Sequence, residues 1–340
     1  MNVHVGGGRS LLQALLLSLP AELHVIALLD ARMQIPDNLP TNLEIRKVQP
    51  SLKKRMAAEW WLARQVQPRD VVLCFGNLPP LFRLRGLAVV FVQNRYLVDR
   101  TSLQGFPLKT RLRLLIERFW LSSKVGNAHA FIVQTPSMQV LTATVVQRLG
   151  KTVDILPFVD VTQGYSRTLE LRRGETDYDF IYVASGEQHK NHRQLIEAWC
   201  RLAKDGLFPS LLLTLDQQSH GQLCAWIDEM KVQFGLRVIN LGVQPHAQVI
   251  KLYTKVKALI YPSTLESLGL PLIEARQAGL AVLAAELDYV RDVLDPEQVF
   301  DPLSAVSIAR AVKRFMGWSE KSLPLANAKM FLQSVLEKCE

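Results

Sequence analysis

Tyr261-Pro-Ser-Thr-Leu-Glu266-Ser-Leu-Gly-Leu-Pro271-Leu-Ile-Glu274-Ala-Arg-Gln-Ala-Gly279 combines the end of an apolar strand, a loop with one carboxylate and a helix start with another. A proline is favourable near a first helical position, because its missing N–H would be unpaired there. The free N–H groups of a helix start bind anions and hydroxyls. The spacing allows Glu266 and Glu274 to face one ligand. Equally, Glu266 can be a solvated loop charge and Glu274 a partner of the helix dipole.

The same residues resemble the E-x7-E signature of the retaining glycosyltransferases of family 4 (group 1), which have the GT-B fold. The resemblance implies that Glu266 meets hydroxyls of the donor sugar and takes part in catalysis, and that Glu274 meets the nucleotide ribose. It also places the backbone of Gly269, Leu270 and Pro271 close to the sugar and phosphate.

Length, composition and charge describe a globular protein with an uneven charge distribution. The chain has 340 residues, enough for two domains with a core each. Its four cysteines have no paired spacing and are interpreted as reduced thiols of a cytosolic protein. Residues 1–160 contain 20 Lys and Arg against 10 Asp and Glu, whereas residues 161–340 contain 20 against 21. The basic first half predicts an anionic partner.

The first thirty residues predict a βαβ unit: a strand over 2–5, a glycine turn at Gly6, Gly7 and Gly8, a helix over 9–18 and a strand over 24–29. One interpretation is a dinucleotide fingerprint with Asp30 as the ribose ligand. The third glycine position holds leucine, so we favour a bare loop at which a diphosphate or acceptor approaches the backbone. The apolar run 11–19 also resembles a secretory signal, but the glycines are better explained by a strand-to-helix turn.

Three further apolar strands alternate with helical stretches and indicate a parallel sheet covered on both faces: 71–75, 87–92 and 130–133. Ligands bind beyond the carboxyl ends of such strands. Asn77, Gln93 and Asn94 follow two of these ends and are predicted either as turn formers or as an acceptor-side wall of a site. Relatives often have a histidine near Gln93, and its absence here leaves the acceptor-activating group open.

Two segments of the first half could touch a membrane. The basic run Lys53, Lys54 and Arg55 is followed by Trp60 and Trp61, for which we favour membrane contact. The segment 108–120 places an apolar stripe on one helical face, composed of Leu108, Leu112, Leu115, Ile116 and Phe119. For this second segment we favour an ordinary helix whose stripe packs on the sheet. No nucleic-acid motif accompanies the charge.

In the second half, a strand over 180–184 leads into Ser185-Gly-Glu-Gln-His-Lys190 and a helix from about residue 191. The segment is similar to the family's donor-diphosphate loop, with Lys190 on its lysine, and the resemblance gives Lys190 a catalytic role. Many members have arginine where this chain has Ser185, so Arg193 or Lys190 alone would have to compensate. The histidines at 189 and 192 have no further ligands at metal spacing, and the D-x-D at 177–179 precedes a strand on the wrong sheet edge.

The sequence therefore predicts an α/β protein with the GT-B fold: two Rossmann-like doubly wound parallel-sheet domains facing across a cleft. The expected parts are an acceptor-side domain at 1–165, a nucleotide-sugar domain at 166–318 and a terminal helix at 319–340 that crosses back. The resemblance implies a metal-independent hexosyltransferase without a cofactor, which uses a nucleotide-diphosphate sugar and retains anomeric configuration. We expect a saccharide or polyprenyl-linked acceptor, as in surface polysaccharide (O-antigen or capsule) synthesis. We expect the protein to be cytoplasmic and peripheral on the inner face of an anionic cell membrane.

Three alternatives share this architecture. A nicotinamide-dependent oxidoreductase would use the N-terminal glycines with Asp30. A nucleotide-sugar epimerase would need the donor alone. A catalytically inactive scaffold would be consistent with the absence of the arginine and the histidine that many relatives have near Ser185 and Gln93.

Overall fold

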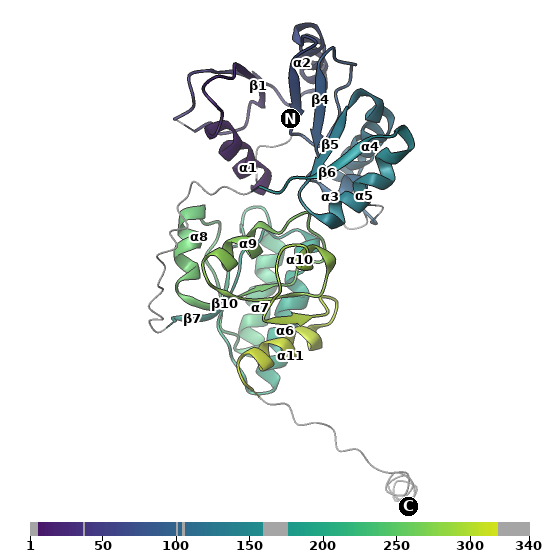
Figure 1. Cartoon of the computed structure of the whole chain (residues 1–340). Helices are drawn as coiled ribbons and strands as arrows, with labels where there is room; N and C mark the ends of the chain where they lie inside the picture. Colours follow the sequence, from purple (N-terminus) through teal and green to yellow (C-terminus); the bar gives the residue numbers. More distant parts are fainter. Residues whose placement is uncertain (1–5, 37, 100, 104–105, 159–175, 319–340) are drawn as a thin grey trace, which may run out of the picture.

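The computed structural model describes residues 6–36, 38–99, 101–103, 106–158 and 176–318. Two α/β domains meet along one side, with the purple-to-teal first domain above the green-to-yellow second domain in Figure 1. Every strand pair among the described residues is parallel. No helix in those ranges is long and apolar enough to span a bilayer.

The second domain is built on one six-stranded sheet. Its strands lie in the order β12 (Gln298–Phe300), β11 (Ala281–Ala285), β10 (Val256–Tyr261), β7 (Tyr178–Tyr182), β8 (Leu211–Leu213) and β9 (Val238–Asn240). The chain starts in the middle at β7, runs outward to β9 and then returns to β10 on the other side. The direction of winding therefore reverses between β7 and β10, and at such a switch point the strand ends leave a crevice for a ligand.

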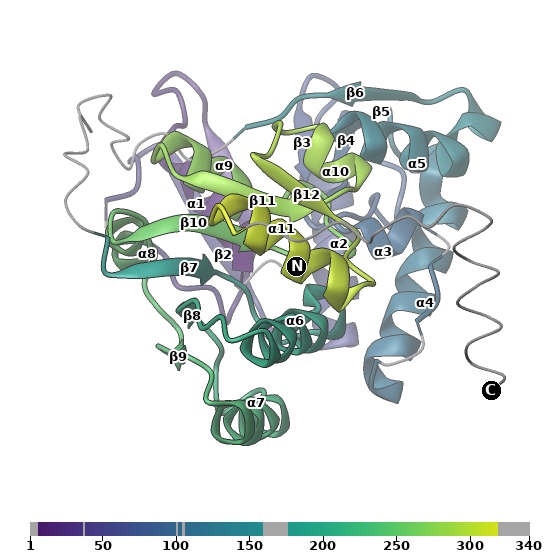
Figure 2. The ribbon, with the colours of Figure 1, turned by 90° about the horizontal axis from the view of Figure 1, so that it is seen from below.

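Helices cover both faces of this sheet (Figure 2). They are α6 (His192–Lys204), α7 (Gly221–Phe234), α8 (His246–Tyr253), α9 (Leu270–Gln277), α10 (Asp288–Arg291) and α11 (Ala305–Phe315). The strand predicted at 180–184 is β7, which lies two residues earlier, and the strand predicted to end at Tyr261 is β10. No sequence pattern indicated β12. Double coverage explains why these strands read as uninterrupted apolar runs.

The first domain contains a pair β1 (Val25–Asp30)–β2 (Leu43–Val48) and a sheet in the order β3 (Val71–Cys74), β4 (Leu87–Phe91), β5 (Ala130–Val133) and β6 (Thr152–Ile155). Its helices are α1 (Gly6–Leu17), α2 (Leu52–Gln65), α3 (Arg95–Val98), α4 (Leu108–Lys124) and α5 (Pro136–Val146). The sequence missed β2 and β6. The predicted strand at 2–5 and the terminal helix at 319–340 lie outside the described residues.

The glycine turn is a correction. Gly6, Gly7 and Gly8 form the first turn of α1 rather than a bare loop before it. Glycine is a poor helix former, so the pattern suggested a turn. A Cβ on Gly7 would lie 2.7 Å from Cδ1 of Leu270 in the other domain, so this position has little room for a side chain.

The apolar stripe of α4 is a second correction. Leu112, Leu115, Ile116 and Phe119 face outward, and the helix packs on the domain through a different face that includes Leu114 and Leu121. The sequence shows two apolar faces on this helix, and only packing shows which of them is covered.

The basic segment on α2 is exposed only in part. Lys53, Lys54 and Trp60 are exposed, but Arg55 turns inward. Its guanidinium carbon lies 4.5 Å from the centroid of the Trp120 ring, and Trp61 is covered by the guanidinium of Arg46. Arg55 and Trp61 are therefore partly covered, and the membrane contact of this segment stays a prediction.

Candidate functional site

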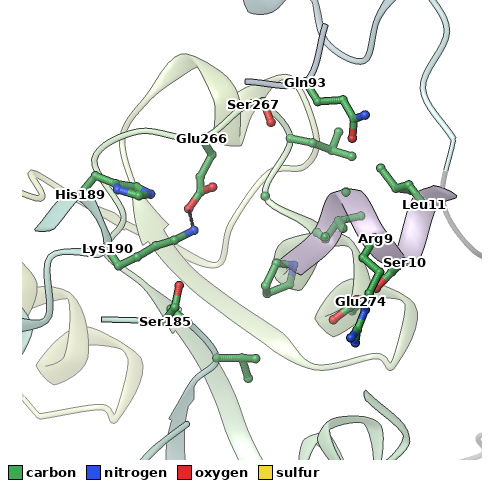
Figure 3. Close-up of a pocket in the computed structure, with 18 of the residues that line it drawn as sticks. Arg9, Ser10, Leu11, Gln93, Ser185, His189, Lys190, Glu266, Ser267 and Glu274 are labelled. Atoms are coloured by element: carbon green, nitrogen blue, oxygen red, sulfur yellow. Dashed lines mark hydrogen bonds and ion pairs between the residues drawn. The ribbon is translucent and has the colours of Figure 1, made fainter. Parts of the chain in front are cut away.

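A pocket of about 760 Å³ lies between the two domains, at the carboxyl ends of the strands. This volume is within the range of small-molecule sites. The second domain contributes the loops after β7 and β10 and the start of α9, whereas the first contributes the start of α1 and the ends of β4 and β5. The structure thus brings together residues that lie far apart in the sequence, several of them labelled in Figure 3.

Lys190 and Glu266 meet in this pocket. Lys190 ends the 3-10 turn η3 (Gln188–Lys190) after β7, and its Nζ lies 2.5 Å from Oε1 of Glu266 in the loop after β10. The hydroxyl of Tyr261 donates to the same oxygen over 2.9 Å. Burial, followed by the charge of Glu266, raises the pKa of Tyr261, which therefore stays a neutral donor. The result is a largely buried ammonium and carboxylate that face one space.

Hydrogen bonds to one carbonyl hold the two loops together. The backbone N–H of Thr264 donates to the His189 carbonyl over 2.8 Å, and the hydroxyls of Ser263 and Thr264 donate to it as well. Asn191, with φ +63°, adopts a left-handed conformation and donates through its side chain to two backbone carbonyls, those of Pro262 and Pro302. The position of Lys190 relative to Glu266 is therefore determined by backbone contacts rather than by the ion pair alone.

Glu274 lies in the second turn of α9, whose N-terminus points into the pocket. Gly269 precedes the helix with φ +73°, a conformation that favours glycine, and a Cβ there would approach Leu272 to 2.9 Å. The carboxylate Oε1 of Glu274 lies 3.0 Å from Nε2 of His246, the first residue of α8. This pair forms a polar part of the pocket lining.

The first turn of α1 closes the pocket from the other domain. A Cβ on Gly7 would lie 2.7 Å from Cδ1 of Leu270, so the two helix starts nearly touch. Arg9, one residue after the glycines, lines the pocket, and its Nε is buried with no hydrogen-bond partner among the described residues. The first domain thus brings a guanidinium to a site where Lys190 is already paired with a carboxylate.

The predicted acceptor-side residues do line the pocket, but their side chains also hold the backbone. Oδ1 of Asn77 accepts from the backbone N–H groups of Gln93 and Asn94, and Asn94 caps α3. The amide of Gln93 donates to the carbonyl of Phe75 over 3.2 Å. Both interpretations of these residues, as turn formers and as a wall, agree with their positions.

Ser185 and Arg193 differ in position. Ser185 lines the pocket and donates to the Glu187 carboxylate. Arg193 does not line the pocket; its guanidinium carbon lies 4.6 Å from the centroid of the Trp226 ring. The structure therefore does not bring Arg193 to the pocket, where it was expected to compensate for the missing arginine, because the side chain packs on Trp226 of α7 instead.

The histidine and aspartate side chains that were considered as metal ligands do not form a cluster. Among the described residues, no group of three or more His, Cys, Asp or Glu side chains is placed to hold an ion. Asp179 of the D-x-D pattern is bound to Ser210 and Lys257 at the opposite end of β7. Burial, followed by the charge of Lys190, lowers the pKa of His189, whose ring lies edge-on to Tyr96 of the first domain.

Sequence reasoning missed Arg9, Tyr96 and His246 as pocket residues. The position of Arg9 directly after a triple glycine at a helix start was a usable signal, since such starts attract anions. His246 follows the end of β9, where ligands of doubly wound sheets are found. Tyr96 gave no signal, because its position depends on how the two domains dock.

Comparison with solved structures identifies the fold class. The chain is similar to sucrose-phosphate synthase from Thermosynechococcus elongatus, with a TM-score of 0.67 and 19% identity over 90% of this chain and 82% of that one. It is also similar to WaaG, a glycosyltransferase involved in lipopolysaccharide biosynthesis, with a TM-score of 0.63 and 17% identity over 91% and 85%. Together with the parallel sheets, these likenesses confirm the predicted GT-B fold.

Comparison by sequence finds similarity to glycosyltransferases in the second half of the chain. Residues 170–328 match the family described as "Glycosyl transferases group 1". The chain is 26% identical to O-antigen chain mannosyltransferase B of Escherichia coli over 44% of this chain and 41% of that protein. It is 28% identical to the serotype-specific mannosyltransferase WbdA of Escherichia coli over 42% of this chain and 18% of that protein. The chain thus spans less than half of the relatives that it matches.

The chain therefore has the GT-B fold, and residues 170–328, most of which form its second domain, are similar to the group 1 glycosyltransferases. The oxidoreductase, epimerase and scaffold alternatives are not favoured by these findings. The Asp30 carboxylate that the oxidoreductase would need is paired with Arg32 at 2.8 Å and does not line the pocket.

Proposed function

We propose that this chain transfers a sugar from a nucleotide-diphosphate donor to a saccharide or lipid-linked acceptor in the synthesis of a surface polysaccharide. The observation that carries the proposal is the meeting of Lys190 and Glu266 in the interdomain pocket, with Glu274 on the helix that opens beside them. The similarity to an O-antigen chain mannosyltransferase supports the polysaccharide. A nucleotide sugar is supported by Anabaena Alr3699/HepE, a structural neighbour with a TM-score of 0.58 that was solved in complex with UDP and glucose.

In this proposal the donor lies on the second domain. Its ribose meets Glu274, its diphosphate meets Lys190 and the N-terminus of α9, and its sugar hydroxyls meet Glu266. Donor binding changes the partner of Lys190: the ammonium moves from the carboxylate toward the phosphate, and Glu266 becomes free to accept hydrogen bonds. A carboxylate that neutralises Lys190 before the donor arrives lowers the cost of keeping an ammonium out of water.

Transfer breaks the bond between the anomeric carbon and the diphosphate oxygen, and the electron pair leaves with the diphosphate. The acceptor hydroxyl forms the new bond on the same face of the sugar, with retention, and its proton passes to the departing phosphate. Lys190 and Arg9, one from each domain, stabilise the charge that develops there. Such preorganised charge is usually the largest catalytic term, so the proposal needs neither a metal ion nor a cofactor.

In this proposal Arg9 supplies the positive charge that many family members have at the position of Ser185. Its buried Nε has no hydrogen-bond partner in the part of the chain that the structure describes, and a diphosphate is an anion suited to a guanidinium. The second cation of the site would thus come from the first domain, which makes donor binding depend on both domains.

The proposal is tested by a thermal-shift screen of the purified protein against a panel of nucleotide sugars and NAD. A ligand that binds the folded state raises the melting temperature. We expect one nucleotide sugar to do so, the shift to be lost in Lys190→Ala, and the control Lys251→Ala, exposed on α8, to keep it. Stabilisation by NAD instead, or conversion of the sugar in the absence of acceptor, would favour an oxidoreductase or an epimerase.

A further inference from the structure

The outer face of α4 is an apolar surface that the proposed reaction does not use. Leu108 and Phe119 are 79% and 72% exposed, and the side chains between them on the same face are each more than half exposed: Leu112, Leu115 and Ile116. Their spacing of three and four residues places them on one stripe, which is about 16 Å long at the rise of an α-helix. None of the five lines the pocket. Solvent exposure of such a stripe in a monomer indicates a surface that binds something.

The inner face of the same helix is already occupied, so the stripe cannot be buried by turning α4. Leu114 and Leu121 are buried in the core of the first domain. The indole N–H of Trp120 donates to the carbonyl of Pro79 over 3.0 Å, and Arg118 donates to the carbonyls of Tyr96 and Asp99. These contacts fix the rotation of the helix, and Figures 1 and 2 both show it at the outer edge of the first domain.

The charge around the stripe has one sign. Lys109 and Arg113 are exposed on α4 itself. All residues of α4 are described, and its single carboxylate, Glu117, is buried on the inner face. The first half of the chain also contains the whole excess of basic residues. A second copy of this chain would bring like charges together across such a face.

We propose that the outer face of α4 lies on an anionic lipid surface, with Leu108, Leu112, Leu115, Ile116 and Phe119 inserted at the headgroup level and the neighbouring lysines and arginines on the phosphates. An amphipathic helix of this kind binds through buried apolar area together with attraction to anionic lipid. Because the surface is on the first domain, docking leaves the donor site of the second domain unobstructed.

The test is flotation of the full chain with phosphatidylcholine vesicles that do or do not contain phosphatidylglycerol. We expect binding to the anionic vesicles that weakens with added salt. The double variant Leu112→Asp with Phe119→Asp should lower the vesicle partition coefficient about tenfold or more. The matched control, Val232→Asp with Leu303→Asp, replaces two comparably exposed residues of the second domain and should bind as the wild type does.

Three results would overturn the proposal. Equal vesicle binding by the wild type and the α4 variant would show that the stripe is not the contact. A dimer of the wild type that becomes monomeric in the variant would make the face a protein interface. A large loss of melting temperature in the variant would mean that the stripe is packed within the intact chain and is not a free surface. The nucleotide-sugar thermal shift is independent of all three, so failure here is distinguishable from failure of the proposed function.

Discussion

Strand β8 of the second domain and strand β3 of the first are similar in sequence and different in environment. Leu211, Leu212 and Leu213 of β8 are completely or almost completely buried, whereas Val71 of β3, in the run VVLC, is 66% exposed. β8 lies inside a six-stranded sheet with helices on both faces, but β3 is at the edge of the four-stranded sheet described for the first domain. An apolar run therefore predicts a strand, and its neighbours determine whether it is covered.

The same contrast holds for the two domains. One hydrophobic cluster connects all six strands and the flanking helices of the second domain, whereas the core of the first domain is divided into three clusters. The family match covers only the second domain. In the proposed function, the second domain, with its single continuous core, is the donor platform, and the acceptor lies against the first domain.

The largest expected effect is on the donor platform itself. Lys190→Ala and Glu274→Ala should each lower sugar-transfer turnover about 100-fold, near 2.7 kcal/mol of transition-state stabilisation for a lost charge contact. The measurement is the initial rate with the donor found by thermal shift, and Lys251→Ala is the control. Normal turnover in the purified Lys190→Ala, Glu274→Ala double variant would refute the site.

The second prediction concerns His192, a buried histidine in the core of the same domain. His192 is buried beside Tyr182 with no hydrogen-bond partner on either ring nitrogen among the described residues, and burial lowers its pKa to about 3. The folded state therefore keeps the ring neutral, while the unfolded chain binds a proton below about pH 6.5. The unfolded state binds more protons in this window, so stability falls as the pH falls, by at most about 1.4 kcal/mol per pH unit.

His192→Phe should remove this part of the pH dependence. Denaturant unfolding at pH 7.5 and pH 5, compared with the wild type, measures it. The control is His24→Phe, at an exposed position of the first domain. If the wild type and His192→Phe lose equal stability between the two pH values, the buried histidine is not the cause.

Arg9 tests whether the first domain contributes to the donor site. Arg9→Ala should weaken donor binding and lower turnover about tenfold, and Arg9→Lys should restore part of both, because a charge is kept but the guanidinium fork is lost. Calorimetric titration with the donor and with the corresponding nucleoside monophosphate separates phosphate contacts from base contacts. Arg148→Ala, exposed and outside the pocket, is the matched control. An unchanged donor affinity would confine the site to the second domain.

The smallest effect concerns the contact between the two helix starts. A methyl group on Gly7 would lie 2.7 Å from the flexible end of Leu270, so Gly7→Ala should lower turnover only about threefold, as Leu270 shifts. In a Leu270→Ala background the penalty should shrink, and a double-mutant cycle measures the coupling. Gly221→Ala, which meets nothing within 4 Å among the described residues, is the control. Additive effects would mean that the domains do not rely on this contact.

The sequence determined most elements of the second domain, β12 excepted, and part of its local chemistry. The strands, the helix that opens at Gly269 and Pro271, and the position of Lys190 after a strand follow from local patterns that the structure retains. Short motifs of this kind work because strand ends and helix starts are set by nearby residues.

Only the tertiary structure decided which side chains share a surface. The docking of the domains brought Arg9 and Tyr96 to the pocket, and packing turned Arg55 and Arg193 onto indole rings. Packing likewise left the second apolar face of α4 uncovered. These outcomes depend on contacts between residues distant in sequence. A local sequence pattern does not determine the free energy of such contacts.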